Sequence, residues 1–343
     1  MKEIAKLNTR ERAFVFRQVA AEMGIIEAIV EKDFWVCWTL FYLFEMSKWK
    51  RALAFKGGTS LSKGFKLIER FSEDVDIILD WRLFGCDDKI AWSDRSGSKE
   101  DKFVKDLNIS ASEFLKTTFL DSLNDDFSVM LNEDFSLFID ESDPQTVCFR
   151  YPQVFEDIYI QKIIRIEAGA IAAWTPATQV NIEPFISEKF RNRMQNPSTN
   201  VLTVAPERTF WEKATILHKE AYRQSGFIPE RYSRHYYDLY KMYNSPVKDL
   251  AYNNLDLLTR VVNFKNKFYR SASARYDLAI PATLKLVPKD NHLNSVKDDY
   301  KAMAGMIYGT IPDFKKIIEC LSIMEREINE LGQAKLVSLS QKE

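Results

Sequence analysis

The segment from Lys56 to Leu79 constrains the fold most, because it holds a pair of adjacent glycines and two aspartates, with one short apolar run before it and another at its end. The first run, 52–55, reads Ala-Leu-Ala-Phe and predicts a short buried strand. Gly57 and Gly58 follow directly and permit a sharp turn whose N–H groups no side chain covers. The chain is therefore expected to leave a buried strand abruptly at this point.

The glycine turn is followed by a predicted helix. Thr59 or Ser60 can cap its N-terminus. Its apolar residues share one face: Leu61, Phe65 and Ile68. Because N–H groups at the start of a helix attract anions, the turn Gly57–Ser60 is a candidate phosphate site.

The second apolar run, 75–79, predicts a strand that carries Asp74 and Asp76 at its start. Residues two apart on a strand point to the same side, so the two carboxylates converge while Val75 and Ile77 face the opposite way. Two such carboxylates repel each other unless a cation lies between them. Mg²⁺, or Mn²⁺ in its place, takes oxygen ligands and often shares substrate phosphates. The pair beside a phosphate turn indicates nucleotide phosphoryl or nucleotidyl chemistry, with an ordinary glycine turn and a solvated strand end as the alternative.

This stretch resembles the signature of the AbiEii/AbiGii toxin family, which belongs to the polymerase-β-like nucleotidyltransferase superfamily. The resemblance is carried by Gly-Gly-Thr-Ser at 57–60 and by Phe-Ser-Glu-Asp-Val-Asp at 71–76. It implies a toxin of a type IV toxin–antitoxin or abortive-infection system, normally encoded with an antitoxin. Some relatives transfer nucleotides to tRNA 3′ ends. A similar Glu-Lys-Asp-aromatic segment, 31–34 here, precedes the glycines in family members; we interpret it as a packing helix with surface charges rather than as catalytic.

A third carboxylate is expected on a neighbouring strand. Glu167 lies in the apolar predicted strand 160–168, and the resemblance supports an acidic residue there. It is the candidate third metal ligand or general base, unless it only pairs with Arg165 or Lys162. Glu183 is the competing candidate.

A helix predicted to begin at Pro206 carries the segment Arg208–Lys213, which is close to the family's second motif. The resemblance implies that Lys213 contacts the phosphates of the nucleotide. An ordinary ion pair with an acid one turn away is the alternative.

A later segment, Arg231–Tyr240, resembles the family's last motif, in which Arg/Lys-Asp-x-x-Asp-Leu is common. The first Asp of that motif is His235 here, and only the second is present, as Asp238. Asp238 is expected to orient Lys213 or the base, whereas a catalytic duty of the first Asp would be absent or altered. A salt bridge between Arg234 and Asp238 is the structural alternative.

Composition sets further bounds. The chain has 48 Lys and Arg against 49 Asp and Glu, a net charge of −1, so binding to nucleic acid needs a local basic surface. The basic residues best placed to form it are Arg231, Arg234, Lys213, Lys219 and Lys241. The four cysteines are far apart and form no Cys-x-x-Cys pair, which argues against a zinc site and fits a reducing cytoplasm. No apolar run is long enough to span a bilayer, so we expect a cytoplasmic protein without a membrane partner.

The predicted fold class is α/β (α+β), over about two domains for 343 residues. Residues 1–190 are expected to form a nucleotidyltransferase-like mixed sheet with flanking N-terminal helices and an insertion near 82–125. Residues 200–335 are expected to form a helical domain that closes the active-site cleft. Within the insertion, 93–102 is predicted as a loop and 109–123 as a helix. A period of two then predicts strands at 127–131, 135–139, 145–150, 160–168 and 178–183.

The combined prediction is transfer of a nucleoside monophosphate from an NTP to an acceptor, with tRNA as the expected acceptor. Asp74, Asp76 and Glu167 would hold the metal, and Lys213 would stabilise the developing charge. Two alternatives stay open. One is a nucleotidyltransferase that modifies a small molecule such as an aminoglycoside or a lincosamide. The other is a non-catalytic nucleotide- or RNA-binding relative, which His235 favours and the intact aspartate pair disfavours.

Overall fold

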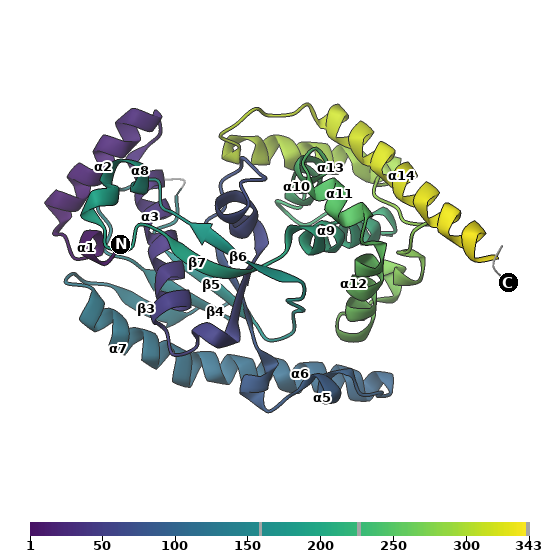
Figure 1. Cartoon of the computed structure of the whole chain (residues 1–343), viewed down its shortest axis with the longest axis horizontal. Helices are drawn as coiled ribbons and strands as arrows, with labels where there is room; N and C mark the ends of the chain where they lie inside the picture. The colour runs from purple at the N-terminus through teal and green to yellow at the C-terminus, as the bar shows by residue number, and fades with distance from the viewer. Residues whose placement is uncertain (158–159, 225–227, 341–343) are drawn as a thin grey trace. The chain divides into compact units, whose positions relative to one another are not determined.

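The computed structural model describes residues 1–157, 160–224 and 228–340, which fold into two compact units (Figure 1). The first unit consists of Met1–Phe65 and Ser72–Val204, and the second of Lys66–Phe71 and Ala205–Glu343. The chain therefore passes between the units three times. Two of these passages lie between the glycine turn and the aspartate pair.

The first unit is built on a seven-stranded mixed sheet in the order β3-β4-β5-β2-β1-β7-β6. Two neighbouring pairs are parallel, β2 with β5 and β1 with β7, and the other pairs are antiparallel. The strands are β1 Leu53–Lys56, β2 Val75–Leu79, β3 Ser136–Ile139, β4 Thr146–Arg150, β5 Ile164–Gly169, β6 Ala177–Ile182 and β7 Thr199–Val204. The mixed α/β fold predicted from the sequence is thus confirmed.

The centre of this sheet is its most apolar part. Leu53, Ala54 and Phe55 of β1 are fully buried, and Ile77, Ile78 and Leu79 of β2 are at most 1% exposed. Consecutive buried residues on a strand require cover on both faces, because successive side chains point to opposite sides. The two strands that flank the glycine turn and the aspartate pair are therefore held by the core on both faces.

Helix α3 (Glu27–Phe41) supplies part of this cover, contacting β5 and β7, and a π-helical turn, Tyr42–Met46, continues it. Helix α2 (Thr9–Met23) is capped at its N-terminus by Asn8, whose side chain accepts from the Glu11 N–H. The remaining helices of the first unit are α1 Lys2–Ala5, α4 Gly57–Thr59, α5 Asp88–Trp92, α6 Gly97–Phe114, α7 Leu120–Met130 and α8 Ser187–Phe190. Figure 1 shows α6 and α7 as nearly one rod running alongside β3 and β4.

Two local predictions in this unit are wrong, and one strand was not predicted. The strand predicted at 127–131 is the end of α7, whose buried Leu123 and Phe127 lie four residues apart, at helical spacing. The loop predicted at 93–102 gives way to α6 at Gly97. Strand β7 was not predicted at all, although it pairs with β1 and β6.

The helix predicted to run from Ser60 through Ile68 is also shorter than expected. A π-helical turn, Ser60–Gly64, follows α4, and Lys66 then adopts a left-handed backbone with φ of 54°. That conformation is unfavourable for a residue with a side chain and cannot continue a right-handed helix. Residues 66–71 instead join the second unit, where the N–H of Phe71 donates to the carbonyl of Met306.

The second unit is helical. Its helices are α9 Pro206–Ala221, α10 Arg234–Tyr243, α11 Val247–Tyr252, α12 Leu255–Phe268, α13 Asp290–Met303 and α14 Phe314–Ser340. Helix α14 packs on α10, and the hydroxyls of Tyr243 and Tyr252 both donate to Glu327. Over the part of the chain that is described, no helix has the length and apolarity needed to cross a membrane.

Candidate active site

The carboxylates predicted to form the site stand on two adjacent strands of the first unit. Asp76 on β2 is the direct register partner of Glu167 on the parallel strand β5. Asp74 immediately precedes β2, and Val75 and Ile77 are fully buried on the other side of the strand. Register partners on neighbouring strands point to the same side of a sheet, so Glu167 faces the same way as the aspartate pair.

The titration of Glu167 reflects this crowding. Its side chain is 42% exposed, yet burial, followed by the charges of Asp76 and Asp74, raises its pKa to about 7. Arg165, whose Nε lies 3.7 Å from Glu167, opposes the shift without cancelling it. A carboxyl that stays protonated up to neutral pH indicates that several negative groups lie close together. A bound cation would reduce the repulsion between them.

Glu183 lies elsewhere in the same unit. It follows β6, which is the edge strand and is separated from β2 by β1 and β7. Its carboxylate pairs with Arg191 at 2.7 Å. The structure therefore brings Glu167 to the aspartate pair and does not bring Glu183 there.

Gly57 packs directly against Asp76. Its φ of +83° lies in the left-handed region, and a Cβ built there would fall 2.0 Å from Oδ2 of Asp76. Only glycine satisfies both the backbone angle and this close approach. A predicted helix separates the glycine turn from the aspartate pair in the sequence. In the structure, Gly57 and Asp76 nevertheless lie in direct van der Waals contact.

The hydroxyls of the turn are used inside the protein. Thr59 and Ser60 are fully buried, and no side chain caps α4, so the predicted capping role is wrong. Oγ1 of Thr59 donates to the carbonyl of Asp74 at 2.6 Å, and Oγ of Ser60 donates to the carbonyl of Gly57 at 2.8 Å. The Thr59 hydroxyl fastens the two halves of the motif together, and the Ser60 hydroxyl and N–H both donate to Gly57 within the turn. The N–H groups that precede Ser60 are therefore the candidate donors to a phosphate.

The donor chemistry of the three carboxylates fits Mg²⁺ or Mn²⁺, because all of their ligand atoms are oxygens. Among the described residues, however, no three His, Cys, Asp or Glu side chains come together closely enough to hold a metal ion by themselves. Mg²⁺ does not require such a cage, since it keeps several waters and usually takes one or two carboxylates together with substrate phosphates.

The second unit contains a different charged cluster. Asp238 on α10 is fully buried and accepts from Arg70, whose Nε and Nη2 lie 2.7 Å from its two oxygens. Nζ of Lys213, on α9, lies 2.8 Å from Oδ2 of the same carboxylate. Burial favours the neutral acid, but the two cations outweigh it and hold the pKa of Asp238 well below its usual value. Asp238 therefore fixes the position of Lys213, and its partners are Arg70 and Lys213 rather than the predicted Arg234.

His235 stands next to this cluster. Burial, together with the charges of Lys213 and Arg234, moves its pKa well below the ordinary value, so the ring is neutral at pH 7. Its Nδ1 is buried and, among the described residues, has no hydrogen-bond partner. Where the resembling motif has a carboxylate, this chain has a neutral ring, and the cluster keeps two cations for one anion.

Arg70 was missed by the sequence reasoning. It lies inside the Lys56–Leu79 segment, but its partner Asp238 is 168 residues away in the chain. No local pattern signals such a pairing. The stretch between the two motif halves also carries Lys63, Lys66 and Glu69, so a basic residue at 70 did not stand out.

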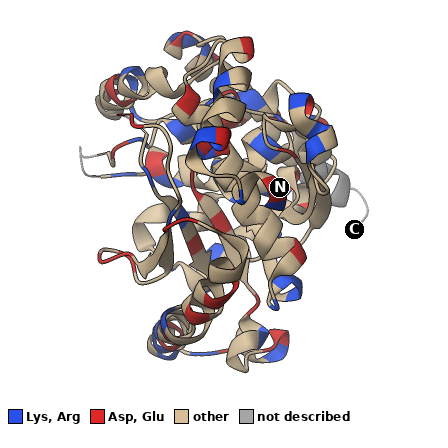
Figure 2. Ribbon diagram, turned by 90° about the vertical axis from the view of Figure 1, so that its left-hand side faces the viewer, with Lys and Arg blue, Asp and Glu red and all other residues tan. Residues whose placement is uncertain are grey.

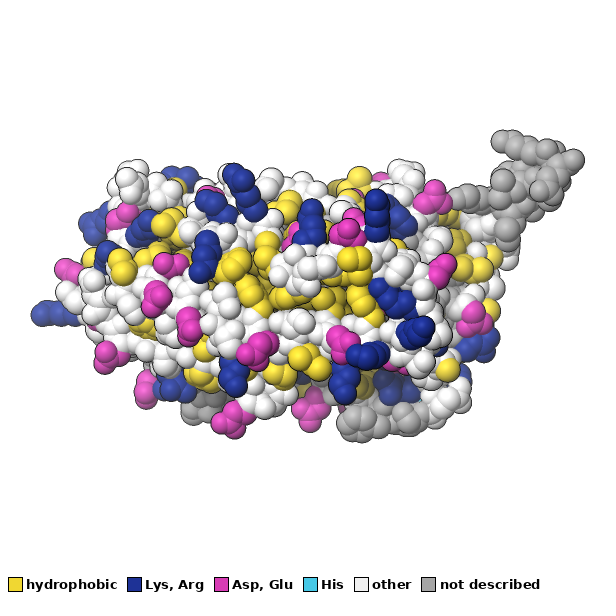
Figure 3. All heavy atoms as spheres, turned by 90° about the horizontal axis from the view of Figure 1, so that it is seen from below, with side chains coloured by type: hydrophobic (Ala, Val, Ile, Leu, Met, Phe, Trp, Pro, Cys, Tyr) yellow, Lys and Arg dark blue, Asp and Glu magenta, His cyan; other side chains and the backbone are white. Residues whose placement is uncertain are grey.

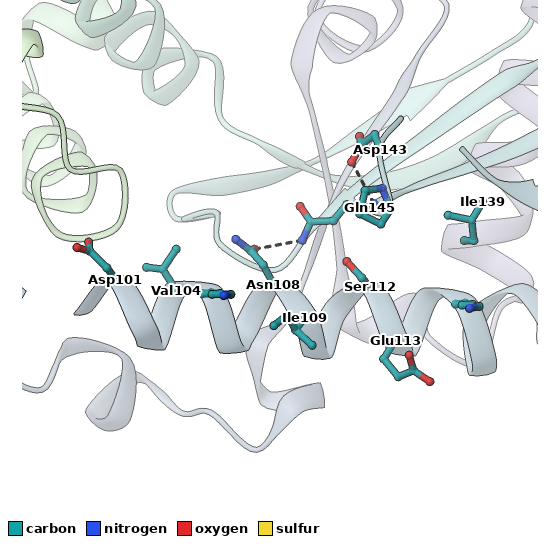
Figure 4. A pocket seen from close by; sticks show the side chains of 12 residues that line it. Asp101, Val104, Asn108, Ile109, Ser112, Glu113, Ile139, Asp143 and Gln145 are labelled. Atoms are coloured by element: carbon teal, nitrogen blue, oxygen red, sulfur yellow. Dashed lines mark hydrogen bonds between the residues drawn. The ribbon is translucent and has the colours of Figure 1, made fainter. Parts of the chain in front are cut away.

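An open groove of about 660 Å³ runs between α6 and the turn after β3 (Figure 4). Asn108 and Gln145 face each other across it, and Nε2 of Gln145 donates to Oδ1 of Asn108 at 3.1 Å. The groove adjoins β5, because the carbonyl of Gln145 accepts from the N–H of Ala168, next to Glu167. Its lining mixes three acids and two lysines with apolar residues: Asp101, Glu113, Asp143, Lys105, Lys116, Val104, Ile109, Ile139 and Pro144.

The predicted basic residues differ in their surroundings. Lys213 is buried against Asp238, and Lys241 pairs with Glu69 at 2.9 Å. Lys219 is half-buried, while Arg231 and Arg234 are exposed. Figures 2 and 3 show acidic and basic positions interspersed in both views, with apolar side chains between them in Figure 3. A nucleic-acid surface would therefore be small and local.

Comparison with known protein families decides the class of this chain. A family model described as nucleotidyl transferase AbiEii toxin, type IV toxin–antitoxin system, matches residues 38–320. The chain belongs to the AbiEii family. It is a nucleotidyltransferase of the toxin class, and the matched range includes the glycine turn, the aspartate pair, Glu167, Lys213 and Asp238. Residues 31–34 precede the matched range.

One solved structure similar to this AbiEii-family chain is MenT4, a nucleotidyltransferase toxin from Mycobacterium tuberculosis H37Rv. The two are 16% identical, the alignment covers 93% of this chain and 98% of that chain, and the TM-score is 0.43. No curated protein matches the chain.

Proposed function

We propose that this AbiEii-family enzyme transfers a nucleoside monophosphate from an NTP to tRNA, with Mg²⁺ or Mn²⁺ as cofactor. The observation that carries the proposal is the register of β2 and β5, which sets Glu167 beside Asp76. The raised pKa of Glu167 supports it, because a cluster of carboxylates in this state gains from a bound cation.

In this proposal Asp74 and Asp76 hold the metal, and Glu167 is either the third ligand or the general base. A bound divalent ion neutralises triphosphate charge and polarises the phosphoryl group under attack. Glu167 is suited to accept a proton from an acceptor hydroxyl, since its pKa of about 7 lies close to a neutral operating pH.

The remaining groups bind and orient the nucleotide. The N–H groups that precede Ser60 in the Gly57–Ser60 turn donate to a phosphate, because the hydroxyls of Thr59 and Ser60 are already used internally. Lys213 stabilises negative charge on the phosphates. Asp238 and Arg70 hold the Lys213 side chain in place, so it does not need to reorganise during the reaction.

The expected partners are a cognate antitoxin and an RNA acceptor. Arg231 and Arg234, which are exposed, are the basic residues that we assign to phosphate contacts with tRNA. Each phosphate contact adds about one unit to the slope of log affinity against log salt, so loss of Arg231 or Arg234 should weaken RNA binding and flatten its salt dependence by about that amount.

Incubation of the protein with each labelled NTP and total RNA, followed by a denaturing gel, tests the proposal. We expect label in the tRNA band with at least one NTP, only when Mg²⁺ or Mn²⁺ is present, and none with Asp76→Asn. Labelling that is unaffected by chelation of divalent ions would contradict the metal assignment. Labelling of another RNA class would contradict the acceptor.

A small-molecule acceptor is the second candidate, and the groove beside β5 favours it. Its volume of about 660 Å³ lies in the range of ligand pockets, and its mixed charges suit an amphipathic ligand better than a polyanion. The same labelled NTPs incubated with aminoglycosides and lincosamides, in place of RNA, would distinguish the two acceptors.

A further inference from the structure

Helix α3 places three consecutive charged residues in the protein interior. Glu31 and Lys32 are 0% exposed and Asp33 is 6% exposed, so the expectation of surface charges on this helix was wrong. With 3.6 residues per turn, neighbours on a helix point about 100° apart. The three side chains therefore leave α3 in three directions, and each reaches a different segment of the first unit.

Lys32 joins the starts of the two strands that carry the carboxylates. Its Nζ lies 3.0 Å from the carboxylate of Glu73, the residue immediately before Asp74. The same ammonium donates to the carbonyls of Gln161 and Ile163, both at 2.6 Å. Ile163 immediately precedes β5, the strand of Glu167. One buried cation thus holds the entry to β2 and the entry to β5 together.

Asp33 reaches the segment that follows the glycine turn. Its Oδ1 lies 2.5 Å from Nζ of Lys63, which belongs to the π-helical turn Ser60–Gly64. Its Oδ2 accepts from the N–H of Phe185 at 2.6 Å. The turn that starts at Gly57 is therefore tied to α3 at its far end.

Glu31 holds the connection between β4 and β5. Its two oxygens accept from the N–H groups of Val154 and Phe155, at 2.7 and 2.9 Å. This connection leads into β5, so Glu31 and Lys32 fix the path of the chain on the way to Glu167.

Three buried charges are an expensive way to pack a helix, because apolar residues of similar volume usually fill a core at lower free-energy cost. A purely structural helix has no need of them. Asp33 reaches the end of the glycine turn, and Lys32 reaches the residue before Asp74 and the residue before β5. Glu31 holds the connection that leads to β5.

We propose that Glu31, Lys32 and Asp33 are positioning residues for nucleotidyl transfer, which hold the three segments of the site in the arrangement that metal and nucleotide require. This inference rests on the proposed function for the role of the carboxylates. None of the three residues touches substrate; they act through Glu73, Lys63 and the backbone before β5.

The test compares Lys32→Met, which removes the charge and keeps most of the stem, with Lys32→Arg, which keeps the charge. Arg12→Met is the matched control. Arg12 is also 0% exposed and lies in the same unit, but its hydrogen bonds go to Glu133 and to the carbonyls of Leu7 and Pro152 rather than to residues 72–79 or 164–169. Both Met variants should lower the melting temperature, so stability alone does not separate them.

Two readouts separate them. We expect Lys32→Met to raise the Mg²⁺ concentration for half-maximal transfer at least about tenfold, Lys32→Arg to recover part of that loss, and Arg12→Met to leave it unchanged. We also expect amide hydrogen exchange of residues 72–79 and 164–169, measured without metal, to accelerate in Lys32→Met and not in Arg12→Met. If Lys32→Met does not fold, Glu73→Gln is measured instead, with a smaller change in the same direction.

The inference is overturned if folded Lys32→Met, or Glu73→Gln in its place, keeps wild-type exchange in both segments and wild-type metal dependence. It is also overturned if Arg12→Met reproduces its effects. Failure of the proposed function gives a different result, namely no transfer by the wild type with any NTP, and the exchange readout then still tests the positioning role.

Discussion

The two charged clusters of this chain shift the pKa of a carboxyl group in opposite directions. In the first unit, Glu167 stands with two other carboxylates, and burial and their charges raise its pKa to about 7. In the second unit, Asp238 stands between two cations, which hold its pKa well below the usual value although it is completely buried. The sign of the nearby charge, rather than the degree of burial, separates the two carboxyls.

The difference indicates what each cluster contributes. The carboxylates of the first unit are an incomplete arrangement that a cation stabilises, as expected of a metal-binding site. The Arg70–Asp238–Lys213 cluster is a complete arrangement with a surplus of positive charge, as expected of a fixed phosphate-binding group. In the proposed function, a metal ion would supply the charge missing from the first cluster and a phosphate the charge missing from the second.

The largest effect should come from Glu167. Replacing it with Gln removes the base or third ligand while keeping size and hydrogen bonding, so transfer should fall by ~10²–10⁴-fold. Glu183→Gln, in the same unit but paired with Arg191 on the far edge of the sheet, should stay near wild type. The measurement is initial rate at saturating NTP. Equal rates for the two variants would remove Glu167 from the site.

A large loss of stability should follow Asp238→Asn. The substitution leaves Arg70 and Lys213 without their shared anion, and breaking a buried pair in this way costs about 3–5 kcal/mol. The exposed control, Arg234→Ala, should change the free energy of unfolding by no more than about 0.5 kcal/mol. Urea denaturation of both variants measures the difference.

The pH dependence of this loss has a definite sign. Because the folded pKa of Asp238 is depressed, its stabilisation is present above the unfolded-state pKa and is lost as pH falls toward the folded value. The gap between wild type and Asp238→Asn should therefore narrow in acid. A gap that widens in acid would contradict the cation-rich account of this cluster.

Gly57→Ala should reduce transfer by about 100-fold, since displacing a catalytic group by about 1 Å has effects of that size. The added Cβ cannot coexist with Oδ2 of Asp76 where it now lies. Gly85→Ala is the matched control, because Gly85 also has a left-handed backbone, with φ of +70°, but nothing lies within 4 Å of its Cβ position. Both variants should lose stability because of the left-handed backbone, Gly57→Ala more so because of the added clash, and only Gly57→Ala should lose activity per folded molecule.

A smaller expected effect is a dependence of Mg²⁺ affinity on pH. Mg²⁺ needs the ionised form of Glu167, so its affinity should rise by up to about tenfold per pH unit below pH 7 and level off above it. Burial also raises the pKa of Glu31 to about 7, so that group titrates in the same range. Calorimetric titration of Mg²⁺ into wild type and Glu167→Gln between pH 5.5 and 8 measures how much of this pH dependence comes from Glu167. A variant as pH-dependent as wild type would assign the proton elsewhere.

The sequence predicted those parts of the molecule whose signals are local. The strands β1, β2 and β5 follow from short apolar runs, and the start of α9 at Pro206 follows from a single residue. The aspartate pair and its shared side follow from the period of two. The strand predicted at 127–131 was wrong because an apolar run of that length fits a strand or the end of a helix equally well.

The partners of buried charges were beyond this kind of reasoning. Lys32 donates to the carbonyl of Ile163, which is 131 residues away in the sequence. Arg70 donates to Asp238, which is 168 residues away. Nothing in the neighbourhood of either residue distinguishes a buried, paired charge from a solvated one. The same holds for Gly57 against Asp76, where the glycine suggested a turn and the close approach emerged only from the fold.

The central claim is that the carboxylates of the first unit hold the metal that accompanies the nucleotide. Calorimetric titration of NTP into wild type and Asp76→Asn, each with and without Mg²⁺, tests it most directly. The account predicts that Mg²⁺ tightens binding to wild type at least about tenfold and has little effect on the variant. Equal affinity of the wild type with and without Mg²⁺ would contradict it.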